Sequence, residues 1–252
     1  MTKQKQKICF IVNPFSGVGK KQNLRQRLER LLDLDQYDYS IQYTEYPGHA
    51  TELAAAAVQE AYDIVVAVGG DGSVNEVMQA LIGTNTTLGI LPAGSGNGLA
   101  MSLGIGRRID PAIQLLNRGR SKTIDSCQLN GTPFINIAGL GFAALVAQRI
   151  KNSRFRGFFG YLWLMLRYAL PYRARHYRIW VDGKKLEGDY VALEVANGPM
   201  YGYNFVVAAF AKFDDAQLDL VLIRKASKLR YLLSAWRFLT RTVHKSRLVE
   251  SY

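Results

Sequence analysis

Three apolar runs in the first half of the chain end abruptly in loops of glycine and small polar residues. The loops are NPFSG at 13–17, GGDGS at 69–73 and PAGSGNG at 92–98, and each leads into a helical pattern. Near-continuous apolar runs are typical of strands that are buried on both faces of a parallel sheet. Because ligands of such sheets bind beyond the carboxyl ends of the strands, we expect the three loops to form one site.

Strand and helix patterns alternate up to about residue 120, and strand patterns dominate after it. This alternation predicts an α/β domain over 1–120, in which helices cover both faces of a parallel sheet. In 121–252, strand patterns flank an Asn-Gly pair at 130–131 and an Asp-Gly pair at 182–183, which are typical hairpin turns. We expect a second, mainly antiparallel β domain there, interrupted by one helical segment at 158–168.

The chain is basic, with 32 Lys and Arg against 20 Asp and Glu and a net charge of +12. This excess favours anionic partners such as phosphates or anionic lipid surfaces. Neither a recognition helix nor an aromatic RNA-binding motif is apparent, so we expect no nucleic-acid partner. The two cysteines belong to no Cys/His cluster, which argues against a structural zinc site. The polar N-terminus does not resemble a signal peptide, and we expect a cytoplasmic location.

The loops suit an anion, since glycines let backbone N–H groups approach phosphate oxygens and helix N-termini add a favourable dipole. Ser73 and Glu76 also stand at capping-box spacing, which explains these two residues but not the three glycines beside them. Asp71 has two interpretations. It is either a turn residue or a carboxylate that holds a magnesium-bound water or accepts a proton from an attacking hydroxyl.

Two standard nucleotide-binding motifs do not match this sequence. A P-loop ending at Gly19 and Lys20 would need glycine at Pro14 and Ser or Thr at Lys21. A dinucleotide fingerprint in GSGNGL would need its third glycine at Leu99. The sequence therefore predicts neither a Walker-type ATPase nor a Rossmann dehydrogenase.

The ordered set NPFSG, GGDGSVNEV and LPAGSGNGLA resembles the catalytic domain of the diacylglycerol kinase and sphingosine kinase superfamily, in its bacterial lipid kinase branch. FINIAGLGF at 134–142, VANGPMYG at 195–202 and KFDDAQLDLVLI at 212–223 extend the resemblance over about 7–224. It implies an NAD-kinase-like α/β domain followed by a β-sandwich. It also implies transfer of the γ-phosphoryl group of ATP to a lipid hydroxyl, on diacylglycerol or a long-chain base.

The resemblance also implies the site residues and two cofactors, ATP and Mg²⁺. The nucleotide contacts would fall on Asn13, Pro14, Phe15, Ser16, Gly17, Thr44, Gly69, Gly70, Asp71, Gly72, Ser73, Val74, Asn75 and Ser95. Asp71 is our candidate catalytic residue. A magnesium ion in the second domain would be held by Asp215 and by main-chain oxygens of Lys212 and Gln217.

The sequence departs from the family pattern at three places. Ala143 replaces an acidic residue, and Ala216 replaces the glycine of an Asp-Asp-Gly turn. Family members usually continue into an Asp-Gly-Glu stretch, which is absent up to Tyr252. These departures leave open a nucleotide-binding remnant of the family without turnover. An NAD kinase-like enzyme is a second alternative, because NAD kinases also carry GGDG. The GSGNGLA and ANGPMYG segments argue against the NAD kinase.

Two basic and apolar segments suggest contact with a membrane. A helix predicted over 227–247 carries an apolar face of Leu229, Leu232, Leu233, Trp236 and Leu239 and a basic face of Arg230, Arg237, Arg241 and Lys245. A basic cluster of Arg149, Lys151, Arg154 and Arg156 precedes the apolar run at 157–171. Both segments suit either an anionic bilayer surface or a core-facing helix with a solvated basic side. We expect a peripheral protein of the inner membrane surface. The sequence is compatible with either a monomer or a homodimer.

Overall fold

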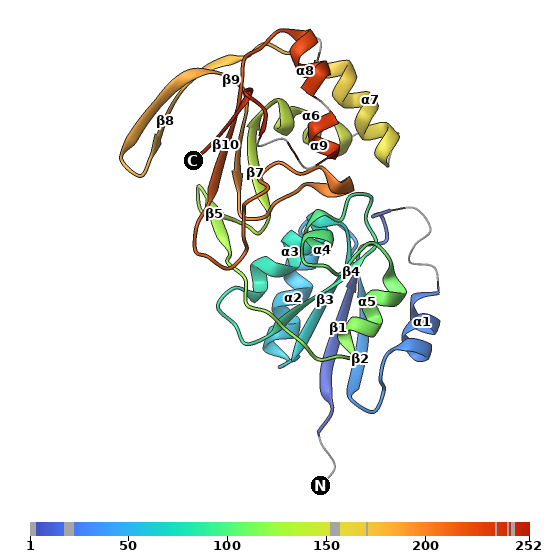
Figure 1. Ribbon diagram of the computed structural model, residues 1–252. Coiled ribbons are helices and arrows are strands. Elements are labelled where there is room, and N and C mark those ends of the chain that lie inside the picture. Colours follow the sequence, from blue (N-terminus) through green and yellow to red (C-terminus); the bar gives the residue numbers. More distant parts are fainter. Residues whose placement is uncertain are drawn as a thin grey trace. The chain divides into compact units, whose positions relative to one another are not determined.

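The structure is a computed structural model that describes residues 4–17, 23–151, 157–169, 171–234, 236–240, 242 and 245–252. The chain divides into two compact units, Met1–Ile135 and Asn136–Tyr252 (Figure 1). This division lies further along the chain than the boundary expected near residue 120. The reason is that β5 (Cys127–Leu129) and β6 (Thr132–Phe134) form a hairpin that contacts a helix of the first unit.

The first unit contains a four-stranded parallel sheet in the order β2-β1-β3-β4, as the alternating pattern predicted. Its strands are β1 (Gln6–Val12), β2 (Tyr37–Tyr43), β3 (Ile64–Gly69) and β4 (Thr87–Pro92). Its helices are α1 (Leu24–Leu31), α2 (His49–Gln59), α3 (Asp71–Leu81), the short α4 (Gly98–Ser102) and α5 (Ile109–Leu116). Helices cover the sheet on both faces (Figure 1).

The core explains why the strands read as continuous apolar runs. On β1, Phe10 and Val12 belong to a buried cluster that includes Leu28 of α1 and Ile113 of α5. The neighbouring Ile11 is equally buried although its side chain points to the opposite face. Each central strand is therefore shielded from water on both sides, and its carboxyl end is where polar loops can begin.

The second unit contains a five-stranded antiparallel sheet, as expected. Its main path runs β11 (Val249–Ser251), β10 (Asp219–Arg224), β9 (Lys184–Ala196) and β7 (Ile137–Gly141), and β8 (Arg175–Val181) pairs with β9. Between β8 and β9, Asp182 and Gly183 have φ of 47° and 77°. Positive φ at both positions is the type I′ geometry, so the predicted Asp-Gly hairpin is confirmed.

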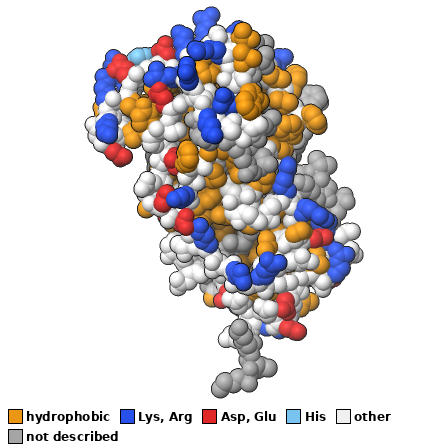
Figure 2. Space-filling view, viewed as in Figure 1, with side chains coloured by type: hydrophobic (Ala, Val, Ile, Leu, Met, Phe, Trp, Pro, Cys, Tyr) orange, Lys and Arg blue, Asp and Glu red, His pale blue; other side chains and the backbone are white. Residues whose placement is uncertain are grey.

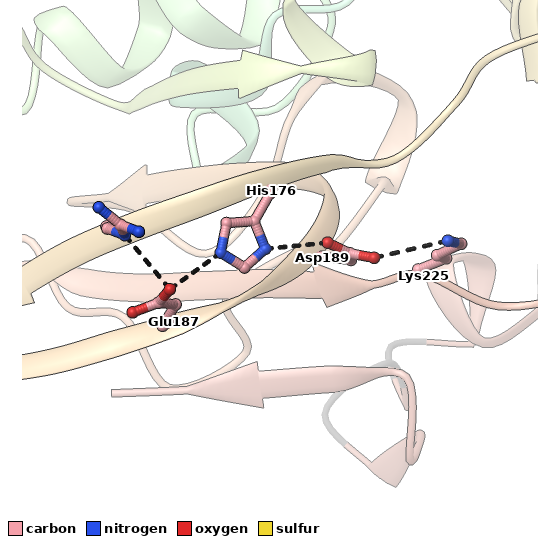
Figure 3. A network of polar contacts seen from close by, with 5 residues as sticks. His176, Glu187, Asp189 and Lys225 are labelled. Carbon is pink, nitrogen blue, oxygen red and sulfur yellow. Dashed lines mark hydrogen bonds and ion pairs between the residues drawn. The ribbon is translucent and has the colours of Figure 1, made fainter.

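The polar face of this hairpin carries a network of charges (Figure 3). His176 lies between two carboxylates, with Nδ1 3.1 Å from Asp189 Oδ1 and Nε2 3.1 Å from Glu187 Oε1. The hydrogen bonds to Glu187 and then Asp189 raise the pKa of His176. Lys185, His176 and Arg178 lower the pKa of Glu187 to about 2. These groups are exposed, so the network adds little stability.

The helices of the second unit differ in part from the sequence prediction. The predicted segment at 158–168 is confirmed as α7 (Phe158–Ala169). The sequence analysis missed α6 (Phe142–Lys151), which starts directly after Gly141 ends β7 at a φ of 84°. Among the described residues, none of the helices combines the length and the apolar character that crossing a bilayer requires.

The continuous helix predicted over 227–247 is wrong. The described residues form α8 (Lys228–Ser234) and α9 (Trp236–Leu239), and further along the chain β11 pairs with β10, so the helix does not extend to residue 247. The β-branched Thr240 and Thr242 have low helix propensity, which helps to end the helix. Arg154, Arg156, Arg241 and the side chains of Lys151, Leu232 and Leu239 lie outside the described residues.

Candidate nucleotide site of the first unit

The loops that follow β1, β3 and β4 meet at one edge of the sheet, as predicted. The side-chain amide of Asn13 donates to Ser73 Oγ at 3.1 Å, which joins the first loop to the second. The backbone N–H groups of Ala93 and Gly94 both donate to the carbonyl oxygen of Gly69 at 2.9 Å, which joins the second loop to the third.

Glycines allow the backbones of these loops to approach each other closely. A Cβ atom added to Gly94 would lie 2.3 Å from the Cα of Gly70, and one added to Gly17 would lie 2.0 Å from the carbonyl oxygen of Ala93. Gly17 also has a φ of 61°, a left-handed backbone conformation that residues with a side chain rarely adopt. Any larger residue at Gly94 or Gly17 would force the loops apart.

The N-terminus of α3 is accessible for an anion. The helix begins at Asp71 after Gly70, and no side chain of the described residues caps it. Gly72 is exposed, and among the described residues nothing lies within 4 Å of the position its Cβ would take. Because helix N-termini favour phosphate groups, the open space beside Gly72 is a candidate position for one.

The capping-box interpretation of Ser73 and Glu76 is wrong, because α3 begins two residues before Ser73. Ser73 lies inside the first turn and is 6% exposed. Its side chain packs closely against Gly69, since a Cβ atom added to Gly69 would lie 2.4 Å from the Oγ of Ser73. Its hydroxyl accepts the hydrogen bond from Asn13, so it links two loops.

Asp71 is more than a turn residue. Its Oδ2 accepts the N–H of Gly98 and its Oδ1 accepts the N–H of Leu99, both at 3.0 Å. The carboxylate therefore caps α4 from a different loop. Asn97, which precedes α4 with a φ of 55°, exchanges two hydrogen bonds with Gly94, at 3.0 and 2.9 Å.

Sequence reasoning missed Asn97, which is 2% exposed and holds the third loop in shape. A signal was present, because asparagine is one of the few residues that tolerate left-handed backbone next to a helix start. In GSGNG the asparagine stands between two glycines, where such backbone is common.

The first predicted loop is shaped by its own hydrogen bonds. Asn13 Oδ1 accepts the N–H of Phe15 at 2.9 Å, and the hydroxyl of Ser16 donates to the Asn13 carbonyl at 3.1 Å. Pro14 and Phe15 are exposed, and the Phe15 side chain keeps 67% of its surface. Thr44, at the end of β2, is buried and its N–H donates to Val12 at 2.9 Å.

The remaining predicted nucleotide-contact residues differ in their exposure and in what they contact. Ser95 is partly exposed in the third loop. Val74 is 3% exposed and packs in the core of the unit. The side-chain amide of Asn75 donates to the carbonyl oxygen of Pro133 at 3.4 Å, so this residue contacts the β5–β6 hairpin. The structure thus brings the loop residues together but gives Val74 a packing role.

The predicted metal residues lie in the second unit on an exposed turn. Asp215 Oδ1 accepts the N–H of Gln217 at 3.2 Å, and Ala216 has a φ of 55°. This left-handed backbone is what the family's glycine would favour, so alanine is strained there, as expected. Burial and then the charge of Asp215 raise the pKa of Asp219.

This turn offers one carboxylate and main-chain carbonyls, a donor set that suits Mg²⁺ chemically. Within the described ranges, no group of three or more His, Cys, Asp or Glu side chains could hold a metal ion. The role of Lys212, Asp215 and Gln217 stays a prediction.

Comparisons with known proteins decide the family. Residues 7–129 match the family model described as the diacylglycerol kinase catalytic domain. Residues 136–244 match the model described as the YegS C-terminal NAD kinase beta sandwich-like domain. A diacylglycerol kinase of Bacillus subtilis (strain 168) is 32% identical over 231 residues, which cover 88% of this chain and 75% of that protein. The chain belongs to the diacylglycerol kinase family.

Other relatives agree with this assignment. A diacylglycerol kinase of Staphylococcus aureus (strain MRSA252) is 30% identical over 225 residues, 86% of this chain and 70% of that protein. The crystal structure of a diacylglycerol kinase from Bacillus anthracis str. Sterne has the same fold, with a TM-score of 0.72 at 22% identity over 99% of this chain and 84% of that one. The predicted family, lipid kinase class and two-part fold are confirmed.

Proposed function

We propose that this chain transfers the γ-phosphoryl group of ATP to the hydroxyl group of a lipid, with diacylglycerol as the first candidate. The observation that carries the proposal is the meeting of three glycine loops beside the accessible N-terminus of α3. Phosphoryl transfer depends mainly on positioning and on neutralising charge, and backbone N–H groups do both. The relatives named diacylglycerol kinase support the lipid acceptor.

In this proposal the loop residues around Asn13, Gly70, Gly72 and Ser95 hold the phosphates of ATP. Bound Mg²⁺ would supply further neutralisation of the phosphate charge. Asp71 fixes the third loop through its two hydrogen bonds to α4. Each carboxylate oxygen has a second lone pair, so Asp71 can also orient a metal-bound water or accept the acceptor's proton.

We place the membrane-facing surface of the protein on α7. Four of its apolar side chains, spaced as one helix face, are 38–82% exposed: Phe159, Leu162, Trp163 and Leu166. The opposite face, with Gly160 and Leu164, is buried. The guanidinium of Arg167 lies 5.3 Å from the ring centre of Trp163. Aromatic, aliphatic and basic groups together suit the interface of an anionic bilayer.

The charge distribution in the second unit supports this placement. The sequence has no Asp or Glu between Phe142 and Val181, nor between Arg224 and Val249. On α8 and α9, Leu229, Leu233 and Trp236 are 53–64% exposed. In Figure 2, hydrophobic and basic side chains lie interspersed over this part of the molecule.

The experiment that tests the function is transfer of labelled phosphate from magnesium-ATP to a panel of acceptors. Diacylglycerol and a long-chain base, each in vesicles containing phosphatidylglycerol, are compared with NAD in solution. We expect label in a lipid product and none in NAD. Label in NAD alone would favour the NAD kinase alternative, and ATP binding without transfer to any acceptor would favour the nucleotide-binding remnant.

A further inference from the structure

A second candidate binding site lies in the first unit, between α1 and α5. A pocket of about 200 Å³ is lined by Arg27, Arg107, Arg108, Ile109 and Asp110. Three arginines and one aspartate give these lining residues a formal charge of +2. None of them belongs to the glycine loops, so the proposed kinase reaction does not account for this concentration of positive charge.

Asp110, the carboxylate of the pocket, makes long contacts with two arginines of α1, Arg27 of the lining and Arg30 beside it. Asp110 Oδ1 lies 3.5 Å from Nε of Arg27, and Oδ2 lies 3.6 Å from Nη2 of Arg30. Both distances exceed the usual range of an N–H···O hydrogen bond. Oδ1 is shielded from solvent and has no hydrogen bond among the described residues. Asp110 therefore offsets part of the positive charge without forming a bidentate pair with Arg27 or Arg30.

The start of α5 adds hydrogen-bond donors to the same pocket. Arg108 is the N-cap residue, with extended backbone, and no described side chain caps the helix. Ile109 and Asp110 occupy the first turn, where backbone N–H groups have no acceptor within the helix. The positive end of the helix dipole thus points to the space that the arginines surround.

We propose that this pocket binds a phosphate group, carried either by a small phosphorylated molecule or by the headgroup of an anionic phospholipid. Guanidinium groups match phosphate oxygens in pairs and stay charged at every physiological pH. With three arginines and the first-turn amides of a helix, the pocket offers donors from several directions. A site of this kind gives the protein an anion sensor or anchor that is separate from the nucleotide loops.

The test measures binding of inorganic phosphate to the full chain by calorimetry, with saturating magnesium-ADP present to occupy the nucleotide loops. Arg107→Glu/Arg108→Glu reverses two charges of the pocket. The matched control is Arg118→Glu/Arg120→Glu, an exposed pair after α5 with the same change of net charge. We expect at least ~10-fold weaker phosphate binding in the pocket variant and less than ~2-fold change in the control, since charge-assisted contacts contribute about a factor of ten each.

A parallel measurement separates the two sources of phosphate. Vesicles of phosphatidylcholine with and without phosphatidylglycerol are sedimented with each variant. A loss confined to anionic vesicles assigns the pocket to a lipid headgroup, and a loss confined to inorganic phosphate assigns it to a small phosphorylated molecule.

Three results would overturn the proposal: equal phosphate affinity in all variants, equal losses in the pocket and control variants, or no saturable binding to either probe. Thermal melting checks that the variants fold, and Arg107→Gln provides a milder second variant. The proposed function is tested separately, because the KM for ATP should stay unchanged in every one of these variants.

Discussion

Leu99 donates its backbone N–H to Oδ1 of Asp71 at 3.0 Å, so a side chain at the start of α3 caps the start of α4. In the Asp71→Asn variant, a side-chain N–H₂ group replaces one of the two carboxylate oxygens that accept the backbone N–H groups of Gly98 and Leu99. We expect Asp71→Asn to lower kcat by at least ~100-fold, the low end for loss of a general base. Steady-state kinetics on vesicles measures this, and near wild-type turnover would remove Asp71 from the mechanism.

A second variant separates the chemical role of Asp71 from its structural role. Asn97→Ala loosens the same loop through Gly94 and leaves the carboxylate in place. If Asp71 only fixes the loop, the two variants should show similar losses in kcat and in melting temperature. A much larger loss of kcat in Asp71→Asn, at similar melting temperature, assigns the carboxylate a part in the reaction.

Gly72→Val should block the nucleotide site while preserving the fold. The added side chain enters exposed space and meets no described protein atom within 4 Å of its Cβ. It would occupy the volume we assign to a phosphate, so we expect the KM for ATP to rise by at least ~10-fold, the value of one lost charge-assisted hydrogen bond. Gln79→Val, on the last turn of α3, is the control. Unchanged ATP binding in Gly72→Val, by calorimetry, would contradict the proposed cradle.

The exposed face of α7 should carry most of the membrane binding. Leu162→Glu/Leu166→Glu places two negative charges on this face without disturbing its buried side. We expect at least ~10-fold weaker partition into phosphatidylglycerol vesicles, because apolar area and charge attraction are both lost. Activity on a short-chain, soluble diacylglycerol should change little.

A control for the membrane experiment lies on the β8–β9 hairpin. Trp180 is 67% exposed there, and Trp180→Glu removes a large aromatic group without touching α7. Partition of this variant should match the wild type. If Trp180→Glu loses binding and the α7 variant does not, the hairpin and not α7 faces the bilayer.

Glu194 on β9 should make stability depend on pH. It is 1% exposed, the hydroxyl of Tyr201 donates to its Oε2, and its Oε1 has no hydrogen bond among the described residues. Burial raises the pKa of Glu194 to about 8. Unfolded glutamate titrates near ~4.3, so between these values the unfolded state binds fewer protons than the native state. The free energy of unfolding should therefore fall as pH rises through this range and level off above it.

Glu194→Gln tests this dependence, because glutamine imitates the neutral carboxyl group. Urea unfolding at pH 5, 7 and 9 should give a flatter profile for the variant, since one such group contributes a slope of up to ~1.4 kcal/mol per pH unit. Glu45→Gln, at an exposed position, is the control and should keep the wild-type profile. Identical profiles for Glu194→Gln and the wild type would show that Glu194 is ionised in the native protein.

Much of the fold could be predicted because periodicity reports burial directly. The runs that became β1 and β3 are apolar at every position because both of their faces are covered. The Asp182-Gly183 turn was predictable because few residue pairs adopt positive φ in succession. The C-terminal helix failed because its length depends on β11 returning to β10, a tertiary pairing that local helix propensity does not contain.

The candidate site was predicted less completely. Glycine loops indicate where backbones approach each other, so their meeting at one edge followed from the parallel sheet. The hydrogen bonds of Asp71 to Gly98 and Leu99 join residues 27 and 28 positions apart, and no local pattern announces them. For the same reason, Ser73 looked like a cap when only its neighbours in sequence were considered.

The contact between Gly70 and Gly94 restricts how this protein can vary. A Cβ added to Gly94 would lie 2.3 Å from the Cα of Gly70, and one added to Gly70 would lie 3.2 Å from the Cα of Gly94, so main-chain atoms limit how close the two loops can come with a side chain between them. Substitutions at exposed or partly exposed positions such as Ser95 or Phe15 can change the charge or the rim of the proposed nucleotide site without touching this contact. Because this contact offers main-chain atoms only, we expect the residues that select the proposed lipid acceptor to lie elsewhere in the chain.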